Sequence, residues 1–116
     1  MRLSYFLEKI FPVPAEADRE MTRLVLDSRQ LKPNDLFVAM PGSRLDGRQY
    51  LQDAISRGVG AILMEAERQV SPVKVNGFSA SLSWQQGVPV IAIDQLRHHL
   101  GFLAARFYGY PAKNPR

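Results

Sequence analysis

The sequence predicts a small α/β domain whose sheet is mixed or mostly parallel and is flanked by helices. Stretches with the features of strands alternate along the chain with stretches in which apolar residues recur every three or four positions, as in amphipathic helices. The chain has 116 residues, which suits one domain with a modest core. Its apolar share of 46% and charged share of 22% are typical of a globular protein, so disorder and fibrous repeats are not indicated.

The first two predicted elements are a helix and a strand. Residues 4–11 are expected to form a short helix, because apolar side chains recur there at helical spacing. Ser4 is a candidate N-cap, and Pro12 should end the helix because proline has no N–H to donate. After a polar loop over 15–20, residues 21–26 are predicted to form a strand.

A turn, a second strand and a second helix are predicted next. Residues 32–35 have the composition of a turn, since proline fixes one backbone angle and Asn and Asp bond to their own backbone. Residues 36–40 are a continuous apolar run, which is typical of a strand covered on both faces. The helix is expected over 48–57, with Asp46 as a candidate cap and Gly58 as its C-terminal stop.

Two more strands and a hairpin are expected in the second half of the chain. Residues 61–64 are predicted to be a buried strand. Residues 73–82 alternate around an Asn-Gly pair at 76–77, which is a strong hairpin signal, so a hairpin or another ordered excursion is predicted there. Residues 88–93 are predicted to be a strand, with Pro89 at its beginning or on an edge of the sheet.

The last predicted element is a helix over 95–108, capped by Asp94. Gly101 lowers the stability of such a helix by about 1 kcal/mol relative to alanine, which suggests close packing at that position. Residues 109–116 contain two prolines and a glycine and have no apolar period, so they are interpreted as a linker. The predicted domain is therefore 1–108.

Two polar segments follow predicted strands and are the best candidates for a binding site. They are 27–30 and 41–47, and the second leads into the start of a helix, where free N–H groups favour an anion. Two such loops could converge on one phosphorylated ligand. Gly42 and Gly47 lack the spacing of a P-loop or a dinucleotide fingerprint, and on physical grounds alone they could equally serve turns.

Several classes of function are disfavoured by composition and spacing. His98 and His99 are adjacent on a predicted helix and point roughly 100° apart, so they are interpreted as part of a solvated face and not as metal ligands. No nucleophile–base constellation is apparent, so neither a catalytic residue nor a metal site is predicted. The chain has no cysteine, and it has no apolar run long enough to span a membrane or to form a signal peptide, so the cytoplasm is expected. The net charge of +4 is scattered without a basic stripe, which argues against nucleic-acid binding.

The sequence resembles the amino-terminal domain of the Mur ligases, most closely that of the MurE type. The resemblance covers nearly the whole chain and is weakest over 68–86. It rests on Leu26-Asp27-Ser28-Arg29, Asp35-Leu36-Phe37-Val38-Ala39, Gly42, Asp46-Gly47, Ala54-Ile55, Gly58-Val59-Gly60-Ala61, Val88-Pro89-Val90-Ile91 and Leu103-Ala104-Ala105-Arg106-Phe107-Tyr108.

The resemblance implies that this domain binds the uridine diphosphate end of UDP-N-acetylmuramoyl-dipeptide. Carried over by position, the uridine-nucleotide contacts fall on Leu26, Ser28, Ser43, Arg44 and Leu45. Leu26 would pack on the nucleoside, the Ser28 hydroxyl would hydrogen-bond the uracil or the ribose, and the backbone of 43–45 would line the uracil pocket. Asp27 and Arg29 would either brace the turn or contact the ligand directly.

The resemblance also implies what the fragment does not do alone. In the family a central domain binds ATP and Mg²⁺, and a third domain helps to bind the incoming amino acid. The family's Gly-Lys-Thr loop does not occur in the 116 residues, so we expect a fragment without a cofactor of its own that is not catalytic by itself. Its expected partners are the UDP-N-acetylmuramoyl-peptide and the central ATPase domain, in the peptidoglycan precursor synthesis that underlies cell wall biogenesis, cell shape and cell division.

Three other interpretations remain open at the level of sequence. The domain could come from a MurF-type ligase, whose chains carry a similar pattern. It could be a non-catalytic interaction domain of the same fold. A basic nucleic-acid-binding module is the third. Neither meso-diaminopimelate nor lysine is distinguished as the amino acid that the parent enzyme adds.

Overall fold

The computed structural model describes residues 1–39, 47–66 and 72–109, and for 47–50 and 109 only the backbone. In these ranges six strands form one sheet in the order β1-β2-β3-β6-β5-β4. The elements in chain order are α1 (Leu3–Phe6), the 3-10 helix η1 (Ala15–Ala17), β1 (Leu24–Val25), the 3-10 helix η2 (Ser28–Gln30), β2 (Leu36–Ala39), α2 (Gly47–Ser56), β3 (Ala61–Glu65), β4 (Val73–Val75), β5 (Phe78–Gln85), β6 (Val88–Ile93) and α3 (Leu96–Gly109).

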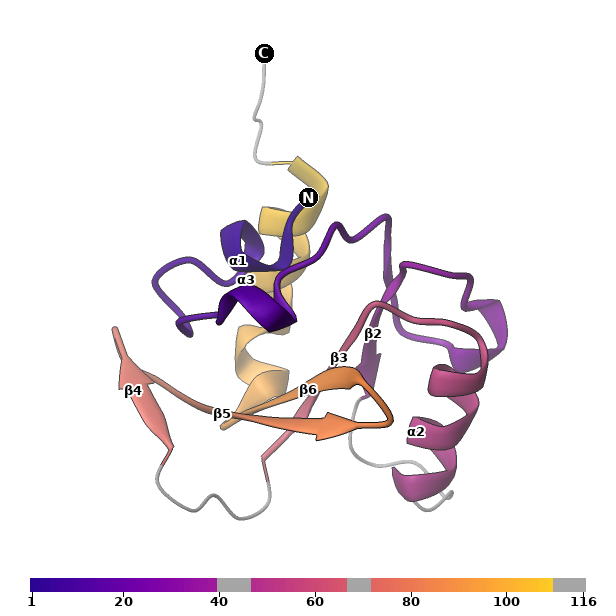
Figure 1. Ribbon diagram of the computed structural model, residues 1–116. Helices are drawn as coiled ribbons and strands as arrows, with labels where there is room; N and C mark the ends of the chain where they lie inside the picture. The colour runs from indigo at the N-terminus through magenta and orange to yellow at the C-terminus, as the bar shows by residue number, and fades with distance from the viewer. Residues whose placement is uncertain (40–46, 67–71, 110–116) are drawn as a thin grey trace.

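The described elements form three layers, with α1 and α3 on one face of the sheet and α2 on the other (Figure 1). This arrangement follows from the two-residue period of the strands, which sends alternate side chains to opposite faces. In β3, for example, Leu63 belongs to the core under α1 and α3, whereas Ile62 belongs to the core under α2. Both side chains are fully buried, as the continuous apolar run at 61–64 predicted.

The sheet is mixed, which confirms the predicted fold class. Strands β1, β2, β3 and β6 are parallel to one another, whereas β5 runs antiparallel to β6 and β4 antiparallel to β5. The parallel strands therefore end at one common edge of the sheet, and the antiparallel strands extend the sheet on the β6 side.

The predicted hairpin is confirmed, and a second hairpin follows it. Asn76 and Gly77 connect β4 to β5 with φ values of 50° and 85°, as a two-residue turn with left-handed backbone requires. Gln86 and Gly87 connect β5 to β6 in the same manner, with φ values of 52° and 83°. β5 extends to Gln85, three residues beyond the predicted end of the hairpin.

Pro89 lies near the beginning of β6, as expected, although β6 is an interior strand. Gln85 pairs with Val88 beside the turn, and Trp84 with Pro89 one position further. That second pair is of the type in which the two residues do not exchange N–H···O bonds. The pairing with β3 begins only at Val90, so neither ladder requires an N–H from Pro89.

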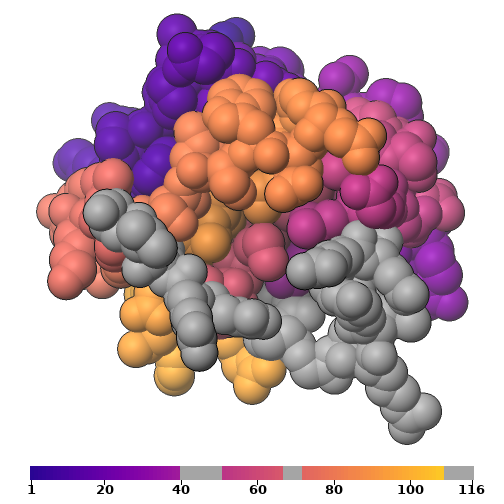
Figure 2. Space-filling view, turned by 60° about the horizontal axis from the view of Figure 1, so that its bottom comes forward, coloured from indigo at the N-terminus to yellow at the C-terminus, as the bar shows by residue number. Residues whose placement is uncertain are grey.

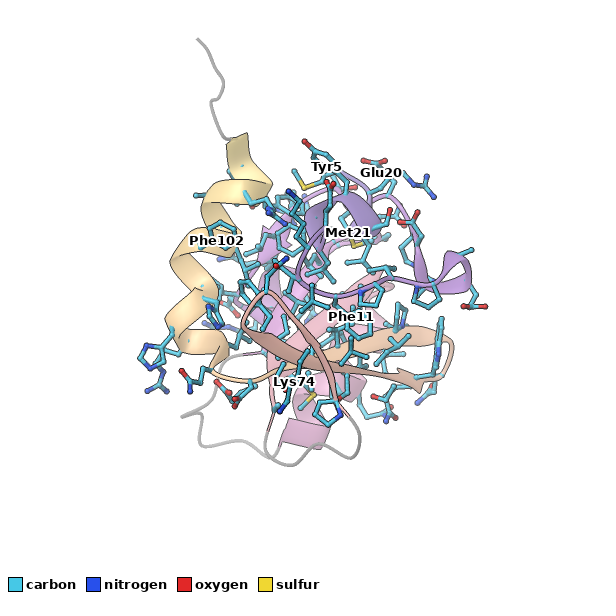
Figure 3. The ribbon with its side chains drawn as sticks, turned by 90° about the vertical axis from the view of Figure 1, so that its left-hand side faces the viewer. Tyr5, Phe11, Glu20, Met21, Lys74 and Phe102 are labelled. Atoms are coloured by element: carbon cyan, nitrogen blue, oxygen red, sulfur yellow. The ribbon has the colours of Figure 1, made fainter. Side chains whose placement is uncertain are left out.

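The first helix is shorter than the predicted 4–11. It ends at Phe6, and Lys9 adopts a φ of 66°, which interrupts the helical backbone. The residue before the helix is Arg2, without a side-chain cap, so the prediction of Ser4 as N-cap was wrong. The apolar stripe is nevertheless buried up to Phe11, which points inward beneath this segment (Figure 3).

The first strand is also shorter than the predicted 21–26, because only Leu24 and Val25 pair with β2. The preceding segment pairs instead with the N-terminus, where Met21 donates its N–H to the Met1 carbonyl at 2.8 Å. Arg2 and Glu20 form an isolated antiparallel bridge there. The interval predicted as a loop therefore packs against the chain start.

The last helix begins at Leu96, so Gln95 and not Asp94 precedes it, and the predicted cap was wrong by one position. Leu103 and Phe107 are buried, as the helical stripe predicted. Gly101 is exposed, and a Cβ built there would meet nothing within 4 Å. The expectation of close packing at Gly101 was therefore wrong.

Gly101→Ala should stabilise the domain by about 1 kcal/mol, because alanine costs less backbone entropy in an exposed helix interior. The free energy of unfolding from urea titration measures this. Gly58→Ala is the matched control, since Gly58 has a φ of 81° and an alanine there is strained. A loss of stability in the Gly101 variant would contradict the open surroundings of this position.

Candidate functional site

The carboxyl ends of the parallel strands define the edge where a ligand site is expected. β1 ends at Val25 and β2 at Ala39, and the register pairs Val25 with Phe37, two residues before the end of β2. β1 and β2 therefore end as neighbouring strands at the same edge, and residues 26–30 leave the sheet there. Figure 2 shows this side of the molecule, with the β5–β6 hairpin above it and α2 and α3 to either side.

Leu26 and Ser28 lie together directly after β1, as the sequence predicted. Leu26 is an exposed apolar side chain with 53% of its surface accessible, whereas Ser28 is 8% accessible. Within the ranges that the structure describes, the Ser28 hydroxyl makes no hydrogen bond. A buried hydroxyl that bonds to none of these residues has capacity for a further partner, so a ligand is suited to it. The other three predicted contacts, Ser43, Arg44 and Leu45, lie outside the described residues.

Asp27 and Arg29 brace the turn, which is one of the two roles left open by the sequence. The Asp27 carboxylate caps η2 by accepting the Arg29 N–H at 2.9 Å, and the guanidinium of Arg29 donates to both of its oxygens at 3.1 and 3.0 Å. The side-chain hydrogen bond from Arg29, and then its backbone N–H, hold the pKa of Asp27 below its usual value. A lowered folded-state pKa means that this support is complete above the usual pKa and is lost as the pH falls through the folded value.

A second Arg–Asp pair fixes the base of the same loop. Arg23 donates from Nη2 and Nε to the two carboxylate oxygens of Asp35 at 2.6 and 3.2 Å, and Nη2 also donates to the Gln30 carbonyl at 3.0 Å. Asp35 is 1% accessible and accepts the Lys32 N–H at 2.9 Å. These bonds join β1, η2 and β2 into one unit. The hydrogen bond to Asp35 raises the pKa of Arg23, and the neighbouring Tyr108 contributes to the rise in a smaller measure.

The turn is also attached to α2. Arg57 donates from Nη1 to the Arg29 carbonyl at 3.3 Å and forms an ion pair with Asp53 at 3.2 Å. Each of the three arginines around η2 is thus paired with an aspartate: Arg23 with Asp35, Arg29 with Asp27 and Arg57 with Asp53. Paired charges attract a diphosphate weakly, so this turn is better suited to a polar nucleoside than to the phosphates.

The outer side of β1 is held by the last helix, which the sequence reasoning did not predict. Tyr108 donates its hydroxyl proton to the Leu24 carbonyl at 2.7 Å, and the same oxygen accepts the Leu24 N–H at 3.0 Å. Arg106, two residues earlier, donates to the Phe6 and Glu8 carbonyls at 2.9 and 2.7 Å. The only signal for these contacts was the resemblance carried by residues 106–108.

Glu65 is a further residue whose role was missed. Its Oε2 accepts the Gln95 N–H at 2.7 Å, a contact that no sequence pattern indicated. Gln95 has a φ of 57°, so the bond holds the strained entrance to α3 against the end of β3. The carboxyl edge of the parallel strands is therefore stabilised in two places, at η2 after β1 and at the bond between Glu65 and Gln95.

Metal-binding side chains are dispersed over the described residues. Among them, no three His, Cys, Asp or Glu side chains are grouped so that they could hold a metal ion. His98 is exposed, and His99 packs against Phe78 with ring centroids 4.4 Å apart and ring planes tilted by 49°. In the same ranges, no helix is long and apolar enough to span a bilayer.

Comparison with known proteins gives a family match over most of the chain. Residues 20–108 match the family described as Mur ligase family, catalytic domain. Three curated relatives are each named UDP-N-acetylmuramoyl-L-alanyl-D-glutamate--2,6-diaminopimelate ligase. The protein of Alkalilimnicola ehrlichii is 39% identical over the whole chain, that of Pseudomonas aeruginosa 38% over 92% of it, and that of Vibrio cholerae 42% over 83%.

The chain is much shorter than these relatives. The matched regions span 23%, 20% and 18% of the three proteins, respectively. The similarity therefore covers about a fifth of each relative.

Proposed function

Because the chain belongs to the Mur ligase family, we propose that it binds the uridine end of UDP-N-acetylmuramoyl-dipeptide for a MurE-type ligase. The observation that carries this proposal is the buried hydroxyl of Ser28. It has no hydrogen-bond partner among the described residues, and it lies beside the exposed Leu26 at the carboxyl edge of the sheet. A nucleoside offers what such a pair requires, namely an apolar ring face and polar groups at its rim.

Each predicted contact has a distinct part in this proposal. Leu26 packs against the nucleoside, and the Ser28 hydroxyl hydrogen-bonds the uracil or the ribose. In this proposal the backbone of residues 43–45 lines the uracil pocket, and the Arg44 guanidinium contacts the diphosphate. Support for the first two contacts comes from the geometry of η2, whose carbonyls accept hydrogen bonds from Arg23 before β1 and Arg57 after α2, which hold the turn in place before a ligand arrives.

The chemistry of ligation is assigned in this proposal to other parts of a longer enzyme. A central domain would bind ATP and Mg²⁺, with residues 109–116 as the linker toward it and 1–108 as the substrate-binding domain. The chain itself would hold no cofactor and would not be catalytic alone. The names of the three relatives favour 2,6-diaminopimelate over lysine as the amino acid that is added. Such an enzyme would act in the cytoplasm on peptidoglycan precursors.

The relatives favour the MurE type over the MurF type, since all three carry the name of the diaminopimelate ligase. A non-catalytic interaction domain of the same fold is the second candidate. It differs in its expected response to ligand, because an interaction domain has no reason to bind a uridine nucleotide at this edge.

UDP titrated into the 116-residue chain should shift the amide resonances of Leu26 and Ser28, with an affinity in the millimolar range. Ser28→Ala should weaken binding about fivefold, since one neutral hydrogen bond is worth about 1 kcal/mol. Amide chemical-shift mapping measures both quantities. Ser56→Ala is the matched control, because the Ser56 hydroxyl bonds to Asp53 within its own helix.

Shifts that cluster around Trp84 or His98 and spare residues 26–28 would place the ligand elsewhere and reject this site. Equal affinities for the Ser28 and Ser56 variants would reject the role of the Ser28 hydroxyl. A response to nucleic acid without a response to UDP would reject the proposed function as a whole.

A further inference from the structure

We infer that Tyr108 is a positioning residue for the uridine site: its hydroxyl holds β1 in place, and β1 sets where Leu26 and Ser28 lie. The inference rests on the proposed function, because it assigns a role toward the same ligand. Tyr108 lies 84 positions from Leu24 in the sequence. It is not proposed to contact the ligand itself. It acts through the backbone of the strand that precedes the site.

The need for such a residue follows from the position of β1 in the sheet. β1 is the outermost strand at its end of the described sheet, and only two of its residues pair with β2. In a parallel pair, one residue directs its N–H and C=O toward the neighbouring strand and the next residue directs them away. Arg23 faces β2, since its carbonyl accepts the Leu36 N–H at 2.7 Å. Leu24 therefore faces outward, where no strand is paired with it.

The Tyr108 hydroxyl satisfies both outward groups of Leu24. It accepts the N–H at 3.0 Å and donates to the carbonyl at 2.7 Å, so one side chain replaces the missing neighbouring strand. A two-residue strand held from one side only would fray readily, because few hydrogen bonds oppose its backbone entropy. Held from both sides, it gives residues 26–28 a fixed starting point.

The two sides of β1 are stabilised by different parts of the chain. On the inner side the Arg23–Asp35 pair joins β1 to β2 and η2. On the outer side the bond comes from the last turn of α3, where the ring of Tyr108 also packs edge-on against Phe107 at 5.2 Å between centroids. The end of α3 is thus connected to the strand before the uridine site by the hydrogen bonds of a single hydroxyl group.

The matched control for Tyr108 is its neighbour Arg106. Arg106 also makes two side-chain hydrogen bonds to backbone carbonyls from the same turn of α3, but to Phe6 and Glu8 at the first helix. Arg106→Met therefore removes a similar attachment without touching β1. Tyr108→Phe removes both bonds to Leu24 and keeps the ring in place.

The experiment measures amide hydrogen exchange at Leu24 and UDP affinity in the wild-type chain and in both variants. Tyr108→Phe should speed the exchange of the Leu24 N–H about tenfold and weaken UDP binding by about threefold or more. Arg106→Met should leave both quantities near the wild-type values, whatever it does to the midpoint of thermal unfolding.

Two results would overturn the inference. One is faster exchange at Leu24 in Tyr108→Phe with an unchanged affinity for UDP, which would show that β1 and the site are not coupled. The other is an equal loss of affinity in Arg106→Met, which would indicate a general effect of destabilisation. Failure of the proposed function is distinguishable, because it shows in the wild-type chain as a lack of any UDP-induced shift at residues 26–28. In that case the inference about Tyr108 is rejected together with the proposed function.

Discussion

Asp35→Ala should lower the free energy of unfolding by about 3 kcal/mol, because it removes the acceptor of a buried, charge-assisted network. Asp35 is 1% accessible, and its loss removes the acceptor of the Lys32 N–H and leaves the Arg23 guanidinium with its bond to the Gln30 carbonyl. The Arg23 side chain is 40% accessible, so water can hydrate it in part, and the cost stays at the lower end of the range for broken buried pairs. Urea denaturation measures the change, provided that the free energy of unfolding falls with urea concentration at the same slope in both proteins.

Asp27→Ala is the comparison that isolates burial. Asp27 makes the same kind of two-pronged bond, to Arg29, but both side chains are exposed, at 36% and 84%. Solvent screening makes such pairs weak, so the loss should be clearly smaller than for Asp35. Equal losses for the two variants would show that burial does not distinguish the two pairs.

Phe6→Ala should cost about 4 kcal/mol, because it creates a cavity between the first and last helices. The Phe6 side chain is fully buried and packs edge-on against Phe107 with ring centroids 5.4 Å apart. Its neighbour Tyr5 lies on the same helix but is 63% accessible and points away from the core (Figure 3). Tyr5→Ala, measured by the same denaturation, should therefore be nearly neutral, and a comparable loss in both variants would contradict this packing.

The sequence predicted those features that depend on neighbouring residues. The apolar runs of β2, β3 and β6 identified buried strands, and the Asn-Gly pair located the hairpin at 76–77. These signals are local, since periodicity and turn chemistry act over a few residues. Gly58 was likewise predicted to end α2, and its φ of 81° is consistent with that role.

The errors concern ends of elements, which depend on distant contacts. The helix at residues 3–6 stops early, although its apolar stripe continues, because Lys9 leaves the helical conformation and Arg106 bonds to the carbonyls at its end. β1 has two residues because the segment before it pairs with the N-terminus. Close packing at Gly101 was predicted only because glycine lowers the stability of a helix relative to alanine. That loss of stability gives no information about which residues surround the position.

For the candidate site, the sequence predicted a polar turn after β1 but not the contacts that position it. Leu26 and Ser28 follow β1 as predicted, and Asp27 caps η2. The bonds from Tyr108 to Leu24 and from Glu65 to Gln95 join residues 84 and 30 positions apart, and neither leaves a local pattern. The roles of residues 43–45 remain a proposal.

The short outer strand β4 has a consequence for how copies of this domain behave at high concentration. A sheet with open edges can recruit a strand from another molecule, and long, flat, apolar edges do so most readily. β4 has only three residues, and Lys74 stands in the middle of it, so a strand added there would have to desolvate an ammonium group (Figure 3). At the opposite end of the sheet the Tyr108 hydroxyl already occupies the outward groups of Leu24. The fold thus opposes self-association through both ends of its described sheet.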